Sequence, residues 1–114
     1  MNKKIRTPKR GEVWWVRLDP TLGSEINKTR PCLVVTTNVL NERRRTVVVI
    51  PLSTSPLANP PLMVALTCAG TAAVAVIDQI RAVSKDRLDK LMSKISPEEL
   101  AGVEEALRSV LELN

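Results

Sequence analysis

The sequence contains no histidine, no tyrosine and no phenylalanine, and it has only two cysteines among its 114 residues. Without histidine, the chain lacks the commonest acid–base catalyst and the commonest metal ligand of proteins. No cluster of cysteines and no acidic cluster with metal-binding spacing takes its place. We therefore expect any chemistry of this protein to be free of metals and cofactors and to use carboxylate, arginine, lysine and hydroxyl groups.

Long apolar runs are also missing. The apolar segment 13–18 is short and Arg17 interrupts it, so we expect no membrane-spanning helix. The basic first residues are not followed by the apolar region of a signal peptide, which favours a cytoplasmic protein. In that compartment Cys32 and Cys68, each in an apolar segment, are expected to be buried free thiols rather than a disulfide.

The length is enough for one domain with a modest core, since two domains would each be too small. The net charge is +5, and residues 1–10 alone contain five basic residues and no acidic one. We expect a basic flexible arm over 1–10 and a single domain over 11–114. A basic chain favours a polyanionic partner, although a solubilising surface charge explains the composition equally well.

Short apolar segments rich in β-branched residues predict five strands in the first two thirds of the chain. The predicted strands cover residues 12–18, 31–37, 46–52, 62–67 and 72–78. The third of them is apolar on both faces, which is typical of a central strand. Short links between consecutive strands favour an antiparallel, curled sheet. The charged segment 38–45 is expected to be one of these links.

The hydrophobic period then changes and predicts two helices, a short one over 84–92 and a longer one over 96–113. The longer helix begins with a capping box formed by Ser96 and Glu99, with Pro97 at its first position. Its apolar stripe is expected to pack on the sheet. The predicted fold class is therefore mainly β with C-terminal helices, a small antiparallel β-barrel or half-barrel closed by an α-helix.

The polar loop between the first two predicted strands carries an acid and two bases in the stretch DPTLGSEINKTRPCLVV (19–35). Lys28 and Arg30 point the same way if this part is extended, and Pro31 biases Arg30 towards an extended conformation. An arginine held there can bind a phosphate through two hydrogen bonds, and Glu25 can accept a proton. From this segment alone, an Arg30–Glu25 ion pair that closes the loop is the favoured alternative.

Hydroxyl groups and a polar cluster mark two further places. Ser53 and Thr54 directly follow the most apolar predicted strand, where hydroxyls can donate to a phosphate or an oxyanion, or form a turn. Asp78, Gln79 and Arg81 interrupt an apolar run and can line a groove or a subunit interface, or form a buried Asp–Arg pair. The sequence has neither a Gly-x-Ser-x-Gly nucleophile elbow nor a glycine-rich phosphate loop.

Four segments of the chain share their residue pattern with one known family. They are GEVWWVRLDPTLGSEINKTRPCLVV (11–35), VVIPLSTS (48–55), VIDQIRAVSKDRL (76–88) and the helix start SPEEL (96–100). The matching residues of the first segment are Gly11, Glu12, Val13, Trp14, Asp19, Pro20, Gly23, Ser24, Glu25, Arg30 and Pro31. Together the segments resemble the MazF/PemK toxins, the ribonuclease halves of bacterial toxin–antitoxin pairs. The resemblance extends from Gly11 to Leu113.

The resemblance implies an SH3-like β-barrel of the CcdB/PemK type that forms a homodimer, with RNA lying in grooves near the dimer interface. It implies sequence-specific cleavage of single-stranded RNA without a metal ion, and hence inhibition of translation and growth. The 2′-hydroxyl attacks the adjacent phosphate and leaves a 2′,3′-cyclic phosphate and a 5′-hydroxyl. The implied partner is a MazE-like antitoxin, whose acidic C-terminal tail would lie in the groove that RNA uses.

The resemblance also assigns site residues. The catalytic arginine of the family falls on Arg30, its glutamate on Glu25, and its threonine on Ser53 or, with a shift of one residue, on Thr54. Serine in place of threonine keeps the hydroxyl. The loops 19–29 and 53–61 and the polar cluster supply the candidate RNA-binding side chains Asn27, Lys28, Thr29, Ser55, Gln79 and Arg81.

Aromatic side chains, on which RNA-binding proteins often stack bases, are scarce here. The chain has only Trp14 and Trp15, and at least one of them is expected to lie in the core. We therefore expect base recognition to rely on hydrogen bonds and groove shape.

Two other functions remain open. A CcdB-like toxin that poisons DNA gyrase shares the fold class, but that family ends in Trp-Gly-Ile and this chain ends in VLELN. An inactive barrel that only binds nucleic acid or an antitoxin is the second alternative. Its one indication is Ser53 in the place of the family threonine.

Overall fold

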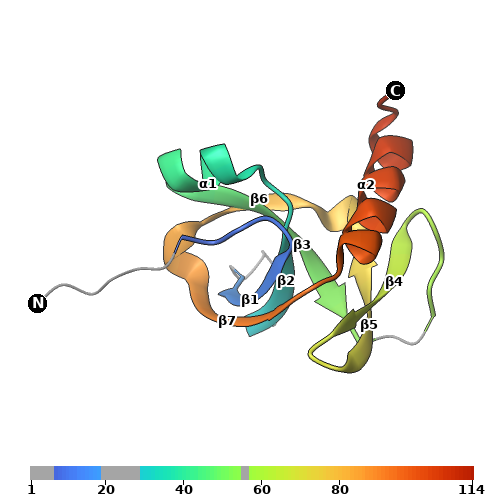
Figure 1. Cartoon of the computed structure of the whole chain (residues 1–114), viewed down its shortest axis with the longest axis horizontal. Coiled ribbons are helices and arrows are strands. Elements are labelled where there is room, and N and C mark those ends of the chain that lie inside the picture. Colours follow the sequence, from blue (N-terminus) through green and yellow to red (C-terminus); the bar gives the residue numbers. More distant parts are fainter. Residues whose placement is uncertain (1–6, 19–28, 55–56) are drawn as a thin grey trace, which may run out of the picture.

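The computed structural model describes residues 7–18, 29–54 and 57–114, so most of the predicted basic arm lies outside the described part (Figure 1). The described strands are β1 (Glu12–Arg17), β2 (Thr29–Val34), β3 (Thr46–Ser53), β4 (Met63–Cys68), β5 (Thr71–Val76), β6 (Arg81–Ser84) and β7 (Leu88–Lys94). The α-helices are α1 (Asn38–Arg43) and α2 (Pro97–Leu111), and the short 3-10 helices are η1 (Ile77–Gln79) and η2 (Lys85–Arg87).

The strands form one antiparallel, curled sheet with β3 at its centre (Figure 1). The order is β4-β5-β3-β2-β1-β7, and β6 pairs with the first half of β3. The last two residues of β3 pair with β5 instead, while β2 pairs along its middle. Strands β1 to β5 match the five predicted strands, with ends shifted by at most three residues. The predicted mainly β fold with a C-terminal helix, and the central place of the third strand, are confirmed.

The predicted helix over 84–92 is wrong. This part of the chain forms the end of β6, then η2, and then most of β7. Leu88 and Leu91 suggested a helix by their spacing, yet they lie opposite Val16 and Trp14 of β1. The β1–β7 pairing contains two register shifts, and such bulges let residues three apart reach the same face of a sheet. Strand pairing with the core therefore overrides the local helical period.

The segment 38–45, expected to be a simple link, contains the short helix α1. Asn41 is fully buried there, and its Nδ2 donates a hydrogen bond of 2.9 Å to the carbonyl of Thr36. A buried amide rather than an apolar stripe holds this helix. Hydrophobic periodicity therefore could not reveal it.

Both faces of the central strands are buried, and each face belongs to a separate core cluster. The cluster inside the curled sheet consists of Trp14, Val16, Cys32, Val34, Val47, Val49 and Val83. The cluster on the other face consists of Val13, Leu33, Ile50, Leu52, Leu66, Cys68, Ala75, Ile77, Ile95, Val103 and Ala106. Both cysteines are buried and free, as predicted.

Helix α2 covers the second cluster and packs against β4 and η1. It begins with the predicted capping box, in which Glu99 N donates to Ser96 Oγ at 3.1 Å and Ser96 N donates to Glu99 Oε1 at 3.2 Å. Pro97 occupies the first helical position. In the described residues, neither helix α1 nor helix α2 is long and apolar enough to cross a membrane.

The start of β1 is fixed by a buried carboxylate and a glycine. Glu12 Oε1 accepts hydrogen bonds from Lys9 N at 2.8 Å and from Trp14 Nε1 at 2.9 Å. Gly11 has φ +94, a conformation that favours glycine. Its N–H donates to the end of β2, and its carbonyl accepts from the backbone just before α2. These two residues thus join the first strand to both the sheet and the closing helix.

Candidate active site

Arg30 and Ser53 come from neighbouring strands. In the β2–β3 pair, Cys32 lies opposite Pro51 and Val34 opposite Val49. Arg30 and Ser53 each lie two residues beyond the Cys32–Pro51 pair, on the same strands. Because residues two apart in a strand project from the same face, the guanidinium and the hydroxyl belong to one side of the sheet.

Both residues line a pocket of about 440 Å³. Thr54 lines it as well, so the structure brings together the three described side chains to which the sequence assigns catalysis. Trp15, Cys68 and Met92 line it from β1, β4 and β7, and the β4–β5 turn completes the wall. The pocket therefore combines a cation and hydroxyls with an aromatic and sulfur-containing surface. Such a surface suits an anion with an attached ring.

Arg30 is half-buried, and its side chain forms no hydrogen bond or ion pair with any residue in the described part of the chain. Its guanidinium offers a planar set of donors that matches a phosphate. The other candidate partner, Glu25, lies outside the described residues, so the Arg30–Glu25 ion pair stays a prediction.

Neither cysteine of the site region is a nucleophile. Burial raises the pKa of the Cys32 thiol from its ordinary value of 9.0 to about 12, although the charges of Arg81 and Arg30 act in the opposite direction. Burial also raises the pKa of Cys68, against a hydrogen bond from Ser93 that lowers it. Both thiols stay protonated near neutral pH.

The other predicted RNA-binding residues are more dispersed. Thr29 is exposed beside Arg30, opposite Arg17. Gln79 is exposed on η1 and Arg81 half-buried at the start of β6, and neither lines the pocket. The alternative of a buried Asp–Arg pair is wrong, since Asp78 is exposed and makes no ion pair with Arg81. The remaining candidates, Asn27, Lys28 and Ser55, lie outside the described residues.

Trp15 and Met92 are pocket residues that the sequence did not indicate. The expectation that one tryptophan lies in the core is confirmed, because Trp14 is only 5% exposed. Trp15, on the opposite face of β1, is half-buried and lies opposite Pro31, the residue after Arg30. Successive side chains of β1 point to opposite faces of the sheet, so the sequence alone implies that Trp14 and Trp15 lie on different faces. Met92 carried no signal, because its segment was predicted to be a helix.

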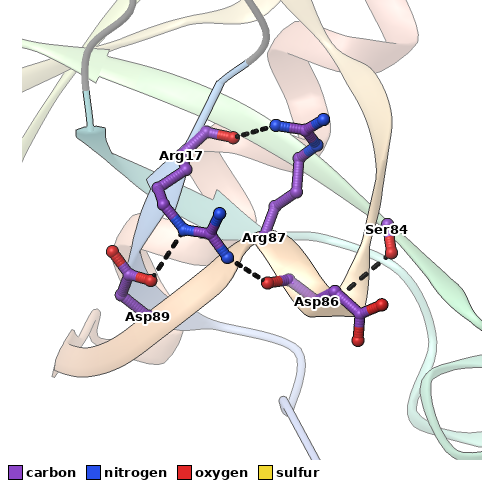
Figure 2. Close-up of polar contacts among 5 residues, drawn as sticks. All are labelled: Arg17, Ser84, Asp86, Arg87 and Asp89. Carbon is purple, nitrogen blue, oxygen red and sulfur yellow. Dashed lines mark hydrogen bonds and ion pairs between the residues drawn. The ribbon is translucent and has the colours of Figure 1, made fainter.

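A network of polar contacts holds the end of β1 from which residues 19–28 lead on (Figure 2). Arg17 Nε donates to Asp89 Oδ1 at 2.9 Å, and the same guanidinium donates to the carbonyl of Asp86. Arg87 Nη1 donates back to the carbonyl of Arg17 at 3.2 Å. Thr29, the first described residue after residues 19–28, pairs with Arg17, so the network lies beside the start of β2 as well.

No three His, Cys, Asp or Glu side chains gather into a possible metal site within residues 7–18, 29–54 and 57–114. The arrangement on β2 and β3 can instead bind an anion through Arg30 and donate hydrogen bonds to it from hydroxyls. It can also place a ring against Trp15.

This chain is similar in sequence and in structure to toxins and endoribonucleases of one family. Residues 9–111 match the family of the PemK-like, MazF-like toxin of type II toxin–antitoxin systems. The endoribonuclease MazF9 of Mycobacterium tuberculosis is 34% identical over 92% of this chain and 97% of its own length. The endoribonuclease EndoA of Bacillus subtilis is 30% identical over 92% of this chain and 95% of its own. A mycobacterial endoribonuclease solved in complex with its cognate antitoxin superposes with a TM-score of 0.78 at 27% identity, over 94% of this chain and 97% of that one.

Proposed function

Because the chain belongs to the PemK-like, MazF-like toxin family of type II toxin–antitoxin systems, we propose that it is a sequence-specific endoribonuclease that cleaves single-stranded RNA without a metal ion. The observation that carries this proposal is the pocket in which Arg30 and Ser53 meet. Named endoribonucleases that align over nearly the whole chain support the same activity.

In the proposed reaction, the 2′-hydroxyl of the RNA attacks the adjacent phosphorus. The new bond joins O2′ to phosphorus, and the bond from phosphorus to O5′ breaks, which gives a 2′,3′-cyclic phosphate and a 5′-hydroxyl. The proton of the 2′-hydroxyl passes to a base, and O5′ receives a proton. Negative charge grows on the non-bridging oxygens of the phosphorane, where preorganised donors lower the barrier.

Arg30 and Ser53 supply these donors in the proposed site. The Arg30 guanidinium binds the non-bridging oxygens through two hydrogen bonds, and the Ser53 hydroxyl donates to one of them. Arg30 is not the proposed base, because a guanidinium has hydrogen-bond donors and no acceptor. Glu25 is the proposed base, because a carboxylate accepts a proton near neutral pH and the family resemblance assigns its glutamate to this residue.

Trp15 gives the proposed site a way to hold a base. Any of the bases can stack on an aromatic side chain, because each base has a π-face. Sequence preference would then come from hydrogen bonds of the loops 19–29 and 53–61. RNA is chosen over DNA by the chemistry itself, since DNA has no 2′-hydroxyl.

The proposed biological setting is a cytoplasmic homodimer that inhibits translation and growth until an antitoxin neutralises it. A relative solved in complex with its cognate antitoxin supports this partner. A MazE-like antitoxin with an acidic C-terminal tail would occupy the basic groove that RNA uses and so exclude the substrate.

The proposal is tested by incubating the purified protein with mixed-sequence single-stranded RNA in EDTA. Arg30→Ala is the loss-of-function variant, and Arg108→Ala, which removes an exposed cation of α2, is the matched control. We expect site-specific cuts by the wild type and the control and none by Arg30→Ala. Intact RNA with all three proteins contradicts the proposal, and binding to gyrase would then separate a CcdB-like toxin from an inactive barrel.

A further inference from the structure

A second pocket, of about 510 Å³, lies at the opposite end of β3 from the candidate active site. It is lined by Arg43, Arg44 and Arg45, which directly precede β3, and by Lys85 of η2. The four residues are called the distal cation site below. Strand β3 runs for seven residue steps from Thr46 to Ser53, which is about 23 Å at 3.3 Å per step.

The backbone of the distal cation site is well fixed. Lys85 N donates to the carbonyl of Arg45 at 2.8 Å, and Arg44 N donates to the carbonyl of Leu40 at 2.8 Å. Thr46 and Ser84 pair in the adjoining sheet. The cations therefore stand on a preorganised frame, which reduces the entropy lost when they bind a ligand.

The cations of this site are not used for internal contacts. Two acids, Glu42 and Asp86, share the pocket, so its net charge is four minus two, or +2. The ion pairs of the described residues are Arg10–Glu104 and Arg17–Asp89, and neither involves the distal cation site. Arg43, Arg44 and Arg45 are exposed and form no hydrogen bond from their side chains to a described residue.

The two cationic sites lie at opposite ends of β3. Thr46 lies opposite Ser84, and Arg45 and Lys85 directly adjoin that pair. Apolar residues of the inner core fill the inside of the sheet between the two ends, so a strand that reaches both sites passes round the sheet. Arg81, half-buried between the two ends, supplies an intermediate positive charge.

We propose that the distal cation site binds phosphates of the same RNA strand whose reacting phosphate lies at Arg30. This inference rests on the proposed ribonuclease function. A stacked strand advances about 3.4 Å per nucleotide, so the two sites are at least about seven nucleotides apart. The distal site thus adds affinity for long RNA and takes no part in the chemical step.

The composition of the pocket favours RNA over an acidic protein segment. Apart from the four cations and the two acids, the lining residues carry hydroxyl groups, and none is apolar. Protein partners usually insert apolar or aromatic side chains into a desolvated centre, and this pocket offers no such centre. Three consecutive arginines offer planar donors that match phosphate oxygens.

The test compares two RNAs with the same cleavage sequence in the middle, one of about 20 nucleotides and one of about five, which is shorter than the separation of the sites. The variant is Arg44→Gln/Arg45→Gln. The matched control is Lys94→Gln/Arg108→Gln, which also removes two exposed cations. Since all four residues are exposed, the circular dichroism and Tm of both variants are expected to stay at the wild-type values.

For the long RNA, Arg44→Gln/Arg45→Gln is expected to raise KM about tenfold with unchanged kcat. The slope of the logarithm of the binding constant against the logarithm of the salt concentration is expected to become less steep by about 1.4, the value for two lost phosphate contacts. For the short RNA, kcat/KM is expected to match the wild type. An unchanged KM for long RNA, or an equal rise in the control, overturns the distal site.

Binding is measured in parallel by fluorescence anisotropy on the long RNA with a 2′-deoxy residue at the cut. This readout tests the distal site even if the wild type cleaves neither RNA, an outcome that contradicts only the proposed ribonuclease. A polyglutamate peptide of similar length is the second probe. Weaker binding of that peptide with unchanged binding of RNA overturns the proposal in favour of a protein-docking site.

Discussion

Arg17 Nε donates a hydrogen bond of 2.9 Å to Asp89 Oδ1, and this contact joins the end of β1 to the start of β7 (Figure 2). Both side chains are about half exposed, with 51% and 43% of their surface accessible. An ion pair at such a site contributes at most about 1 kcal/mol to folding. The contact instead positions the end of β1, from which the chain leads on towards Glu25.

Replacing Arg17 with alanine is therefore expected to lower kcat about tenfold while Tm changes by only a few degrees, since small misplacements of reacting groups are costly. Steady-state kinetics and thermal unfolding are measured on the same sample. Asp89→Asn serves as the comparison, because Arg17 keeps its bond to the carbonyl of Asp86 in that variant. Equal kcat in Arg17→Ala and wild type contradicts the positioning role.

The serine at the end of β3 is expected to be the catalytic hydroxyl rather than its neighbour. Ser53 is half-buried at the end of β3, two residues from the Cys32–Pro51 pair, whereas Thr54 is exposed. Removing one donor to a developing oxyanion typically costs about 100-fold or more in kcat. We expect that loss for Ser53→Ala, near-normal rates for Ser53→Thr, and a loss below about fivefold for Thr54→Ala. A larger loss for Thr54→Ala than for Ser53→Ala reverses the assignment.

The two tryptophans are expected to respond in opposite ways to truncation. Trp14→Ala removes a core side chain and leaves the buried carboxylate of Glu12 without its indole donor. This change is expected to cost about 3–5 kcal/mol of unfolding free energy. Trp15→Ala is expected to fold and to raise KM about tenfold, since a stacked base contributes about 1–3 kcal/mol. Trp15→Phe keeps a stacking surface and should restore most of the affinity; a KM as high as that of Trp15→Ala contradicts stacking.

The raised pKa of Cys32 makes stability fall at alkaline pH. The folded state holds this proton more tightly than the unfolded chain, so the contribution is complete below the ordinary value of 9.0 and is lost as pH rises towards about 12. Between pH 8 and pH 10 the free energy of unfolding of the wild type is expected to fall by about 1 kcal/mol more than that of Cys32→Ala. Urea unfolding at each pH measures both values. Parallel curves for the two proteins contradict a buried protonated thiol.

Much of the fold was predictable because its signals are local. β3 is apolar on both faces, and Ser96, Pro97 and Glu99 mark the start of α2 without any tertiary information. The part around β7 was not predictable, because bulges opposite β1 bring Leu88 and Leu91 to one face at a spacing that mimics a helix. Local periodicity carries no information about such bulges.

The residues of the candidate site also differ in how far the sequence predicts them. Arg30, Ser53 and Thr54 were indicated by their residue types at strand ends and by the family resemblance, and they meet in one pocket. Trp15 and Met92 complete that pocket from strands distant in the sequence, and only the pairing of β1 with β2 and β7 brings them there. The sequence predicts only a charged link at Arg43, Arg44 and Arg45, because nothing local shows that Lys85 lies against them.

The central claim is that Arg30 and Ser53 promote attack by a 2′-hydroxyl on the adjacent phosphate. It is tested most directly with one RNA that carries a single 2′-deoxy nucleotide on the 5′ side of the mapped cut, compared with the same RNA unmodified. We predict that the unmodified strand yields a 2′,3′-cyclic phosphate and a 5′-hydroxyl, and that the deoxy strand stays intact in the same reaction. Cleavage of the deoxy strand at the same position, or a 5′-phosphate on the product, contradicts this mechanism.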